Sequence, residues 1–118
     1  MRPEGRDRAC LWDMLAAARE AQEHVQGLTF EQYIIDLKAR RAIERTLEII
    51  GEAASKVSEA FYIAHPEIDW RRIKGLRNII SHEYDKVRHD LLWAVVKTDL
   101  PVLIARLETI HLDPNDNP

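Results

Sequence analysis

The chain has 118 residues, of which 46% are apolar and 31% charged, and its net charge is −3. This length is enough for one domain with one hydrophobic core and too short for two. We therefore expect a single domain over 1–118, with its core at about 8–110 and a frayed tail at 111–118. No apolar stretch is long enough to span a membrane, and the composition excludes a disordered chain.

The single cysteine and the first residues both bear on location. Cys10 has no second cysteine to pair with, which excludes an internal disulfide and fits a reducing compartment. The first eight residues lack the apolar stretch of a secretory signal peptide. We expect a cytoplasmic protein.

The first two predicted helices have recognisable start and stop signals. Asp7 is suited to cap a first helix that stops at Gly27. Its apolar residues recur at helical spacing, namely Leu11, Met14, Leu15, Ala18, Ala21 and Val25. Residues 29–32 (Thr-Phe-Glu-Gln) have the form of a capping box, which predicts a short second helix. We expect it to bend near 37–41 into a third.

The third predicted helix has an apolar seam whose residues are three or four positions apart: Ile43, Leu47, Ile50, Ala54, Val57 and Phe61. Gly51 lies within this helix and costs about 1 kcal/mol relative to alanine, which predicts the close approach of another helix. Beside it, Glu52 is expected to pair with an arginine. The helix is expected to end before Pro66, because a residue that precedes proline avoids helical geometry.

Two further helices complete the predicted fold. Asp69 is expected to cap a fourth helix with Ile73, Leu76, Ile79 and Ile80 on its buried side, followed by a loop at 84–86. A fifth helix is expected over 89–110, kinked or restarted at Pro101 with Asp99 as a local cap. No segment alternates with period two. The sequence predicts an all-α, up-and-down bundle of four to five helices.

Positive charge is concentrated in one segment. Residues 69–88 contain six basic and three acidic side chains, a net charge of +3, which leaves −6 for the rest of the chain. A local basic surface on an acidic body suits a focused phosphate site, although a solvated helix face of mixed charge explains it equally well. The first reading predicts RNA-binding roles for Arg71, Arg72, Lys74, Lys86 and Arg88.

The same segment contains the motif Arg-Asn-Ile-Ile-Ser-His-Glu-Tyr at 77–84. A guanidinium is shaped to hold phosphate oxygens, and an imidazole moves protons near neutral pH. Asn78 and His82 are four apart and share a helix face, so the amide can fix the orientation and tautomer of the ring. Arg77, Asn78 and His82 are therefore predicted to catalyse metal-free cleavage of a phosphodiester, most simply in RNA, with Tyr84 beside the same pocket.

The reaction itself favours a homodimer. Cleavage needs a base, an acid and a stabilising cation, and one histidine cannot easily act on both sides of the phosphate. Two copies of His82 in one symmetric cleft solve this problem. The seam of the third helix and the three tryptophans are expected to supply the apolar dimer surface.

Simpler explanations stay open at this point. His82 is able to stabilise a helix C-terminus, and Arg77 to pair with Glu83 or Asp85. The remaining histidines show no metal-ligand spacing, and there is no glycine-rich phosphate loop, so we expect neither a metal nor another cofactor.

The motif also resembles a known family. Arg77-Asn78-x3-His82-x-Tyr84 is similar to the Arg-x4-His-x-Tyr signature of the HepT-like toxins of the HEPN superfamily. Segments 49–54, 65–70 and 99–101 resemble other recurring parts of that family, in the same order, so the likeness covers about 8–110.

The resemblance implies an all-α, homodimeric, metal-independent endoribonuclease with Arg77 and His82 in a cleft between protomers. It implies the toxin of a type II or type VII-like toxin–antitoxin pair, silenced when a nucleotidyltransferase antitoxin transfers AMP to Tyr84. A nucleotide brings negative charge to a cationic cleft and competes with RNA. The alternatives are a non-catalytic, nucleotide- or nucleic-acid-binding subunit of a nucleotidyltransferase, and a purely structural dimerisation bundle.

Overall fold

The computed structural model describes residues 5–80 and 87–110, and within these ranges all regular structure is helical. The elements in chain order are α1 (Gly5–Val25), α2 (Phe30–Ile35), α3 (Leu37–Ser55), α4 (Glu59–Ala64), α5 (Trp70–Lys74), α6 (Leu76–Ile80), α7 (His89–Ala94), the π-helical turn η2 (Val95–Asp99) and α8 (Leu100–Glu108). The prediction of an all-α fold is confirmed. The predicted loop at 84–86 and the predicted frayed tail at 111–118 lie outside the described residues.

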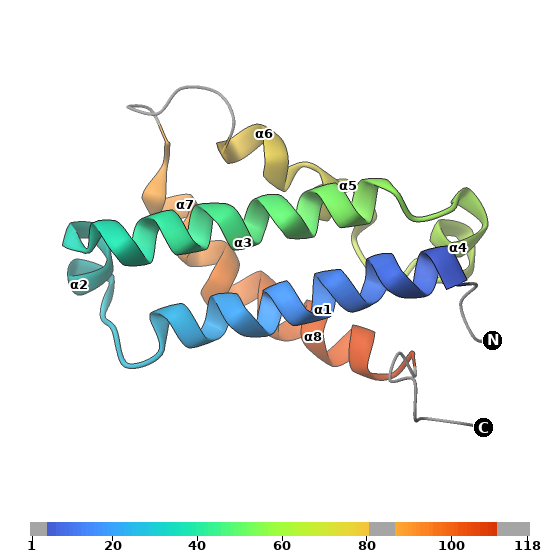
Figure 1. The fold of residues 1–118 in the computed structure, drawn as a ribbon, viewed down its shortest axis with the longest axis horizontal. Coiled ribbons are helices and arrows are strands. Elements are labelled where there is room, and N and C mark those ends of the chain that lie inside the picture. Colours follow the sequence, from blue (N-terminus) through green and yellow to red (C-terminus); the bar gives the residue numbers. More distant parts are fainter. Residues whose placement is uncertain (1–4, 81–86, 111–118) are drawn as a thin grey trace.

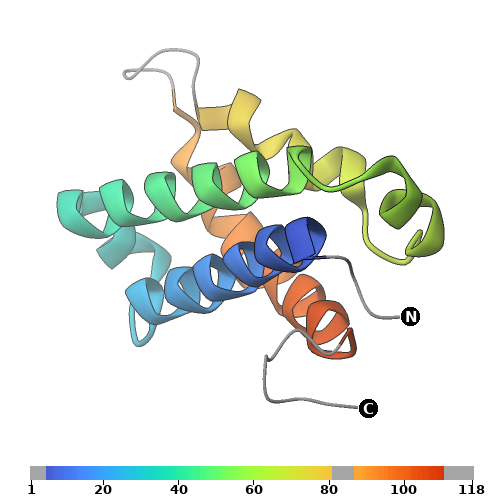
Figure 2. The ribbon, with the colours of Figure 1, turned by 45° about the vertical axis from the view of Figure 1, so that its right-hand side comes forward.

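Two long helices form the frame of the molecule. α1 and α3 pack side by side in opposite directions (Figure 1). α5 and α6 lie on the side of α3 that faces away from α1, as both Figure 1 and Figure 2 show. The segment formed by α7, η2 and α8 passes from α3 to α1 and closes the core.

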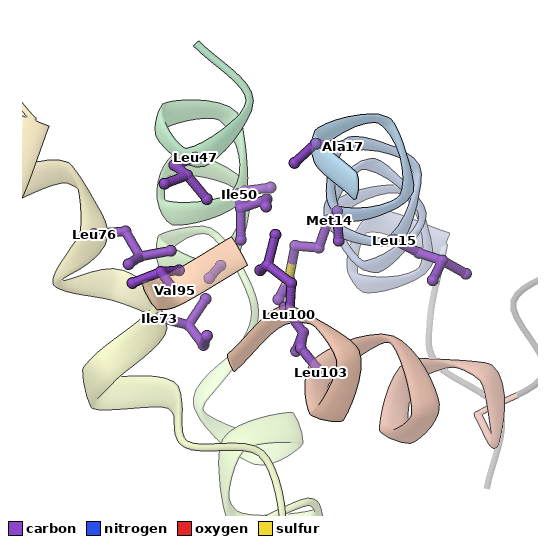
Figure 3. Packing of buried hydrophobic residues seen from close by; sticks show 14 of the residues in the cluster. Met14, Leu15, Ala17, Leu47, Ile50, Ile73, Leu76, Val95, Leu100 and Leu103 are labelled. Atoms are coloured by element: carbon purple, nitrogen blue, oxygen red, sulfur yellow. The ribbon is translucent and has the colours of Figure 1, made fainter. Parts of the chain in front are cut away.

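The core lies where these helices meet, and Figure 3 shows part of it. The apolar stripe of α1 and the seam of α3 are buried as predicted, and each seam residue is 5% exposed or less. This burial makes one expectation wrong. Neighbouring helices of the same chain already cover the seam, so it does not supply a dimer surface. Trp70 is buried as well, whereas Trp12 is 41% exposed.

Local capping signals are confirmed where their partners are close in sequence. Thr29 Oγ1 accepts from the Gln32 backbone N–H at 3.1 Å, and Gln32 Oε1 accepts from the Thr29 N–H at 2.9 Å, which forms the predicted capping box. Gly27 follows α1 with a φ of +79°, a conformation that glycine adopts without strain. The break between α2 and α3 falls at Asp36, whose carboxylate caps α3.

The expected role of Asp7 is wrong. Asp7 lies inside α1 and is buried, and its carboxylate accepts hydrogen bonds from the backbone N–H and the hydroxyl of Ser58, at 2.9 and 2.6 Å. Ser58 in turn caps α4 by accepting from the Phe61 N–H at 3.2 Å. The third helix therefore ends at Ser55, well before Pro66, because Ser58 has an extended backbone held by Asp7.

The fourth and fifth predicted helices are each divided. Asp69 caps α5 as expected, but the helix is interrupted at Gly75 before α6 begins. The predicted restart near Pro101 is present, and the turn before it is π-helical. Asp99 makes no capping hydrogen bond there, which corrects the prediction. Its carboxylate instead accepts from Nε of Arg72 on α5.

Candidate functional site

The first half of the predicted motif lies on α6. Leu76 is 1% exposed and points into the core beside Val95, as does Ile73 on α5 (Figure 3). The next two residues, Arg77 and Asn78, are exposed. The short helix α6 is therefore anchored on the inside by Leu76 and presents an arginine and an amide on the outside.

The Arg77 side chain lies against Gly51, the one glycine of α3. A β-carbon built on Gly51 would lie 2.8 Å from Cγ of Arg77, 3.3 Å from its backbone nitrogen and 3.4 Å from the Ile73 carbonyl oxygen. The predicted close approach of another helix to Gly51 is confirmed. The sequence did not show which residue approaches Gly51. In the folded chain this residue is Arg77, the arginine of the predicted catalytic motif.

The second half of the motif is His82 and Tyr84, which lie outside the described residues, as do Lys86, Glu83 and Asp85. The predicted hydrogen bond between Asn78 and the imidazole therefore stays a prediction, and so does the position of the phenol. The described chain resumes at residue 87, and α7 packs on α3, as α6 does.

The predicted RNA-binding cations of α5 have different neighbours. Arg72 forms an ion pair with Asp99, and the hydrogen bond to that carboxylate raises the pKa of the guanidinium further. The Lys74 ammonium lies 4.7 Å from the centre of the Tyr62 ring on α4. Arg71 is exposed on the same helix. Arg72 and Lys74 are therefore each engaged by a side chain of another element.

Arg88 is also engaged by a carboxylate. Its Nε and Nη2 donate to the two oxygens of Asp90 at 3.0 and 2.8 Å. Asp90 and Asp99 both lie outside the segment 69–88, so the count of +3 along the sequence overstates the positive charge that its surface presents. The two carboxylates therefore partly offset the positive charges of Arg72 and Arg88.

A partly buried polar cluster lies at the start of α7. Nη1 of Arg40 is 3.5 Å from Nε2 of His89, and the His89 ring lies edge-on to the Tyr33 ring at 6.4 Å. Within the described ranges, the Tyr33 hydroxyl, Nε of Arg40 and Nδ1 of His89 are buried without a hydrogen-bond partner. Burial raises the pKa of Tyr33 to about 12, and burial together with Arg40 lowers the pKa of His89. Sequence reasoning missed this cluster because its members are far apart in the chain and match no motif.

Three remaining observations on the described residues concern the partner of Glu52, metal binding and membrane spans. Glu52 pairs with Lys56 at 3.4 Å, so the prediction of an arginine partner is wrong. No group of three or more histidine, cysteine, aspartate or glutamate side chains is arranged to hold a metal ion in the described ranges. None of the described helices is long and apolar enough to cross a membrane.

Comparison with known proteins identifies the family. Residues 14–110 match the family model for HepT-like proteins, described as Ribonuclease HepT-like. The chain belongs to this HepT-like ribonuclease family, whose signature suggested the candidate site.

Individual relatives agree with the family match. The chain is 36% identical over 101 residues to "Probable ribonuclease HepT" of Thermococcus cleftensis, an alignment that covers 86% of this chain and 92% of the relative. It is 34% identical over 103 residues to "Putative RNase MJ1380" of Methanocaldococcus jannaschii, with 87% and 94% covered. No solved structure matches the chain significantly.

Proposed function

We propose that the protein is a metal-independent endoribonuclease in which Arg77 holds the scissile phosphate of RNA and His82 transfers protons. The observation that carries this proposal is the position of Arg77, exposed on α6 while its first carbons lie against α3. The guanidinium of an exposed arginine carries a planar fork of donors that can hold two phosphate oxygens at once. Membership of a ribonuclease family supports the same chemistry.

The reaction follows from the groups of the motif. A base takes the proton of the 2′-hydroxyl, the 2′-oxygen bonds to phosphorus, and the bond from phosphorus to the 5′-oxygen breaks as an acid protonates that oxygen. Arg77 stabilises the charge that develops on the phosphoryl oxygens. Asn78, four residues before His82, orients the imidazole. Arg71 and Lys74 attract the RNA backbone, with smaller contributions from Lys86 and from the carboxylate-paired Arg72 and Arg88.

The proposed active unit is a homodimer of HEPN-like, up-and-down bundles. Its support is chemical, since one motif histidine per chain must serve a reaction with two proton transfers. Apolar surface for a dimer is available on the described residues outside the buried α3 seam. The large apolar side chains exposed there are Trp12, Ile35, Leu37, Ile63, Leu91 and Val102.

The proposed control is that of a toxin–antitoxin pair. A nucleotidyltransferase antitoxin would join the Tyr84 phenol oxygen to the α-phosphorus of ATP, with pyrophosphate as the leaving group. The added AMP places a negative charge two residues from His82, where it competes with RNA. Intact-mass spectrometry after co-expression tests this step. We expect an AMP-sized increment that is absent from Tyr84→Phe, and an increment that persists in that variant contradicts the assignment.

The ribonuclease itself is tested with purified protein, RNA and EDTA. We expect cleavage by the wild type and a loss of about 10²–10⁴ in rate for His82→Ala, the usual effect of removing an acid–base group. Arg77→Ala is expected to lose activity while it keeps the helical circular dichroism of the wild type. Unchanged cleavage by either folded variant contradicts the proposed roles.

A further inference from the structure

Gly51 is an unusual residue for its position. It is buried inside the 19-residue helix α3, four residues before the helix ends at Ser55, where glycine weakens a helix relative to alanine. Alanine is used freely at buried positions of the same helix, for example at Ala53 and Ala54. The fold therefore has a reason to exclude even one methyl group at residue 51.

The neighbours of Gly51 supply that reason. A β-carbon added at Gly5 or Gly27 meets no atom within 4 Å, and one added at Gly75 meets carbonyl oxygens of α5, the helix directly before it. A β-carbon at Gly51 would instead meet Cγ of Arg77 at 2.8 Å, a separation that real β-carbons essentially never show. The atom of another helix that lies closest to the added β-carbon is therefore a side-chain carbon of Arg77, the arginine of the motif.

The overlap between a β-carbon at residue 51 and Arg77 cannot be removed by a small side-chain movement. Cγ is the second carbon of the Arg77 side chain, so moving it requires a change of rotamer that redirects the guanidinium. The Arg77 backbone nitrogen at 3.3 Å and the Ile73 carbonyl oxygen at 3.4 Å also limit movement of the backbone. Leu76 and Ile73 hold α5 and α6 in the core, where they are 1% and 4% exposed. A side chain at residue 51 must therefore displace the Arg77 side chain, the helix α6, or both.

We propose that Gly51 is a positioning residue for Arg77: the missing side chain on α3 sets the rotamer and the height of the arginine that binds the scissile phosphate. The contact belongs to the structure, whereas its effect on RNA cleavage rests on the proposed function. Gly51 touches no reacting group itself and acts through Arg77.

The first test compares Gly51→Ala with Gly5→Ala, a matched substitution of a helical glycine whose new methyl group meets nothing. We expect Gly51→Ala to lower kcat/KM for RNA cleavage about tenfold or more at equal folded fraction, because an error of about 1 Å in position can cost 10²-fold in rate. We expect Gly5→Ala to stay within about twofold of the wild type. Full activity of folded Gly51→Ala overturns the proposal.

A double-mutant cycle separates positioning from a general structural effect. If Gly51 acts through the Arg77 side chain, Gly51→Ala costs about tenfold in the wild-type background and less than about twofold when added to Arg77→Ala. A change that only loosens the fold would lower cleavage by the same factor in both backgrounds. That equal loss is the result that overturns the proposal.

Measurements without RNA keep this test independent of the ribonuclease assignment. In ¹⁵N–¹H spectra, Gly51→Ala is expected to move the Nε–Hε signal of Arg77, whereas Gly5→Ala leaves it in place. If the wild type cleaves no RNA, the proposed function fails, while an unmoved Arg77 signal is what refutes the positioning contact. If Gly51→Ala does not fold, Gly51→Ala/Arg77→Ala is compared with it. Recovery of folding supports the contact with the Arg77 side chain. Failure to recover shows that the backbone contacts at 3.3 and 3.4 Å exclude the methyl group instead, which overturns the role assigned to that side chain.

Discussion

The Arg77 side chain combines a fixed stem with a polar head, because its Cγ lies over Gly51 while the residue is exposed. Substitution by lysine separates charge from shape. We predict that Arg77→Lys loses nearly as much cleavage activity as Arg77→Ala, since an ammonium keeps the charge and loses the fork that holds two phosphate oxygens. Initial rates on one RNA substrate at fixed ionic strength provide the measurement. If the lysine variant keeps most of the activity, Arg77 supplies only positive potential.

The surroundings of His89 predict how the stability of the fold depends on pH. Burial first and Arg40 second hold the His89 pKa below its usual 6.5. Below pH 6.5 the unfolded chain therefore binds a proton more readily than the folded one. The neutral His89 ring therefore makes its full contribution to the free energy of unfolding above pH 6.5. This contribution is lost as the pH falls through the pKa of His89 in the folded protein. We predict that the free energy of unfolding decreases between pH 7.5 and pH 5, measured by urea denaturation.

The control for this prediction is His89→Gln, which removes the titrating ring and keeps a polar side chain. Its stability is expected to differ from that of the wild type at every pH, so the slope against pH is the quantity to compare. A smaller loss of stability toward acid pH is expected for the variant. Equal slopes for the two proteins would show that His89 does not titrate as its surroundings indicate.

Among the helical elements, the junction between α3 and α4 depends on a single distant carboxylate. Asp7 accepts two hydrogen bonds from Ser58, which is 51 positions away in the sequence. We predict that Asp7→Ala destabilises the fold by about 1–3 kcal/mol, because it leaves these donors without their acceptor. Asp13→Ala is the control, since Asp13 is exposed on the same helix. Urea midpoints that shift equally in both variants would contradict this role for Asp7.

The same junction explains which parts of the fold the sequence predicts. The signals at Thr29 and Asp69 act within three residues of themselves, so their helices begin where local chemistry places them. The end of α3 and the partner of Asp99 depend on Ser58 and Arg72, which meet their partners only in the folded chain. No local pattern shows such contacts.

The candidate site divides in the same way. The choice of Arg77, Asn78 and His82 follows from residue types and spacing, which the printed sequence contains. The contact between Arg77 and Gly51 does not follow from residue types and spacing, because it exists only once α6 is packed on α3. The overstated charge of the segment 69–88 has a similar cause, since the carboxylates that engage its arginines lie outside it.

At the scale of the whole molecule, the shared cleft is a claim about assembly. We predict that adding an excess of the inactive Arg77→Ala/His82→Ala chain suppresses wild-type cleavage, because mixed dimers lack one full set of groups. The control is an equal excess of an unrelated protein that binds no RNA. Sedimentation should show dimers at the concentrations used. Monomers with full activity, unaffected by the inactive chain, would refute the shared cleft.

The central claim is that the motif cleaves RNA by transfer of the 2′-hydroxyl proton, and the ends of the products test it most directly. The substrate is an RNA oligonucleotide that the protein cuts, beside a copy with a single 2′-deoxy nucleotide at the position cut, both in EDTA. We predict 2′,3′-cyclic phosphate and 5′-hydroxyl ends from the first substrate, identified by mass spectrometry, and no cleavage at the modified position of the second. Products with 5′-phosphate ends, or equal cleavage at the 2′-deoxy position, would contradict the proposed mechanism.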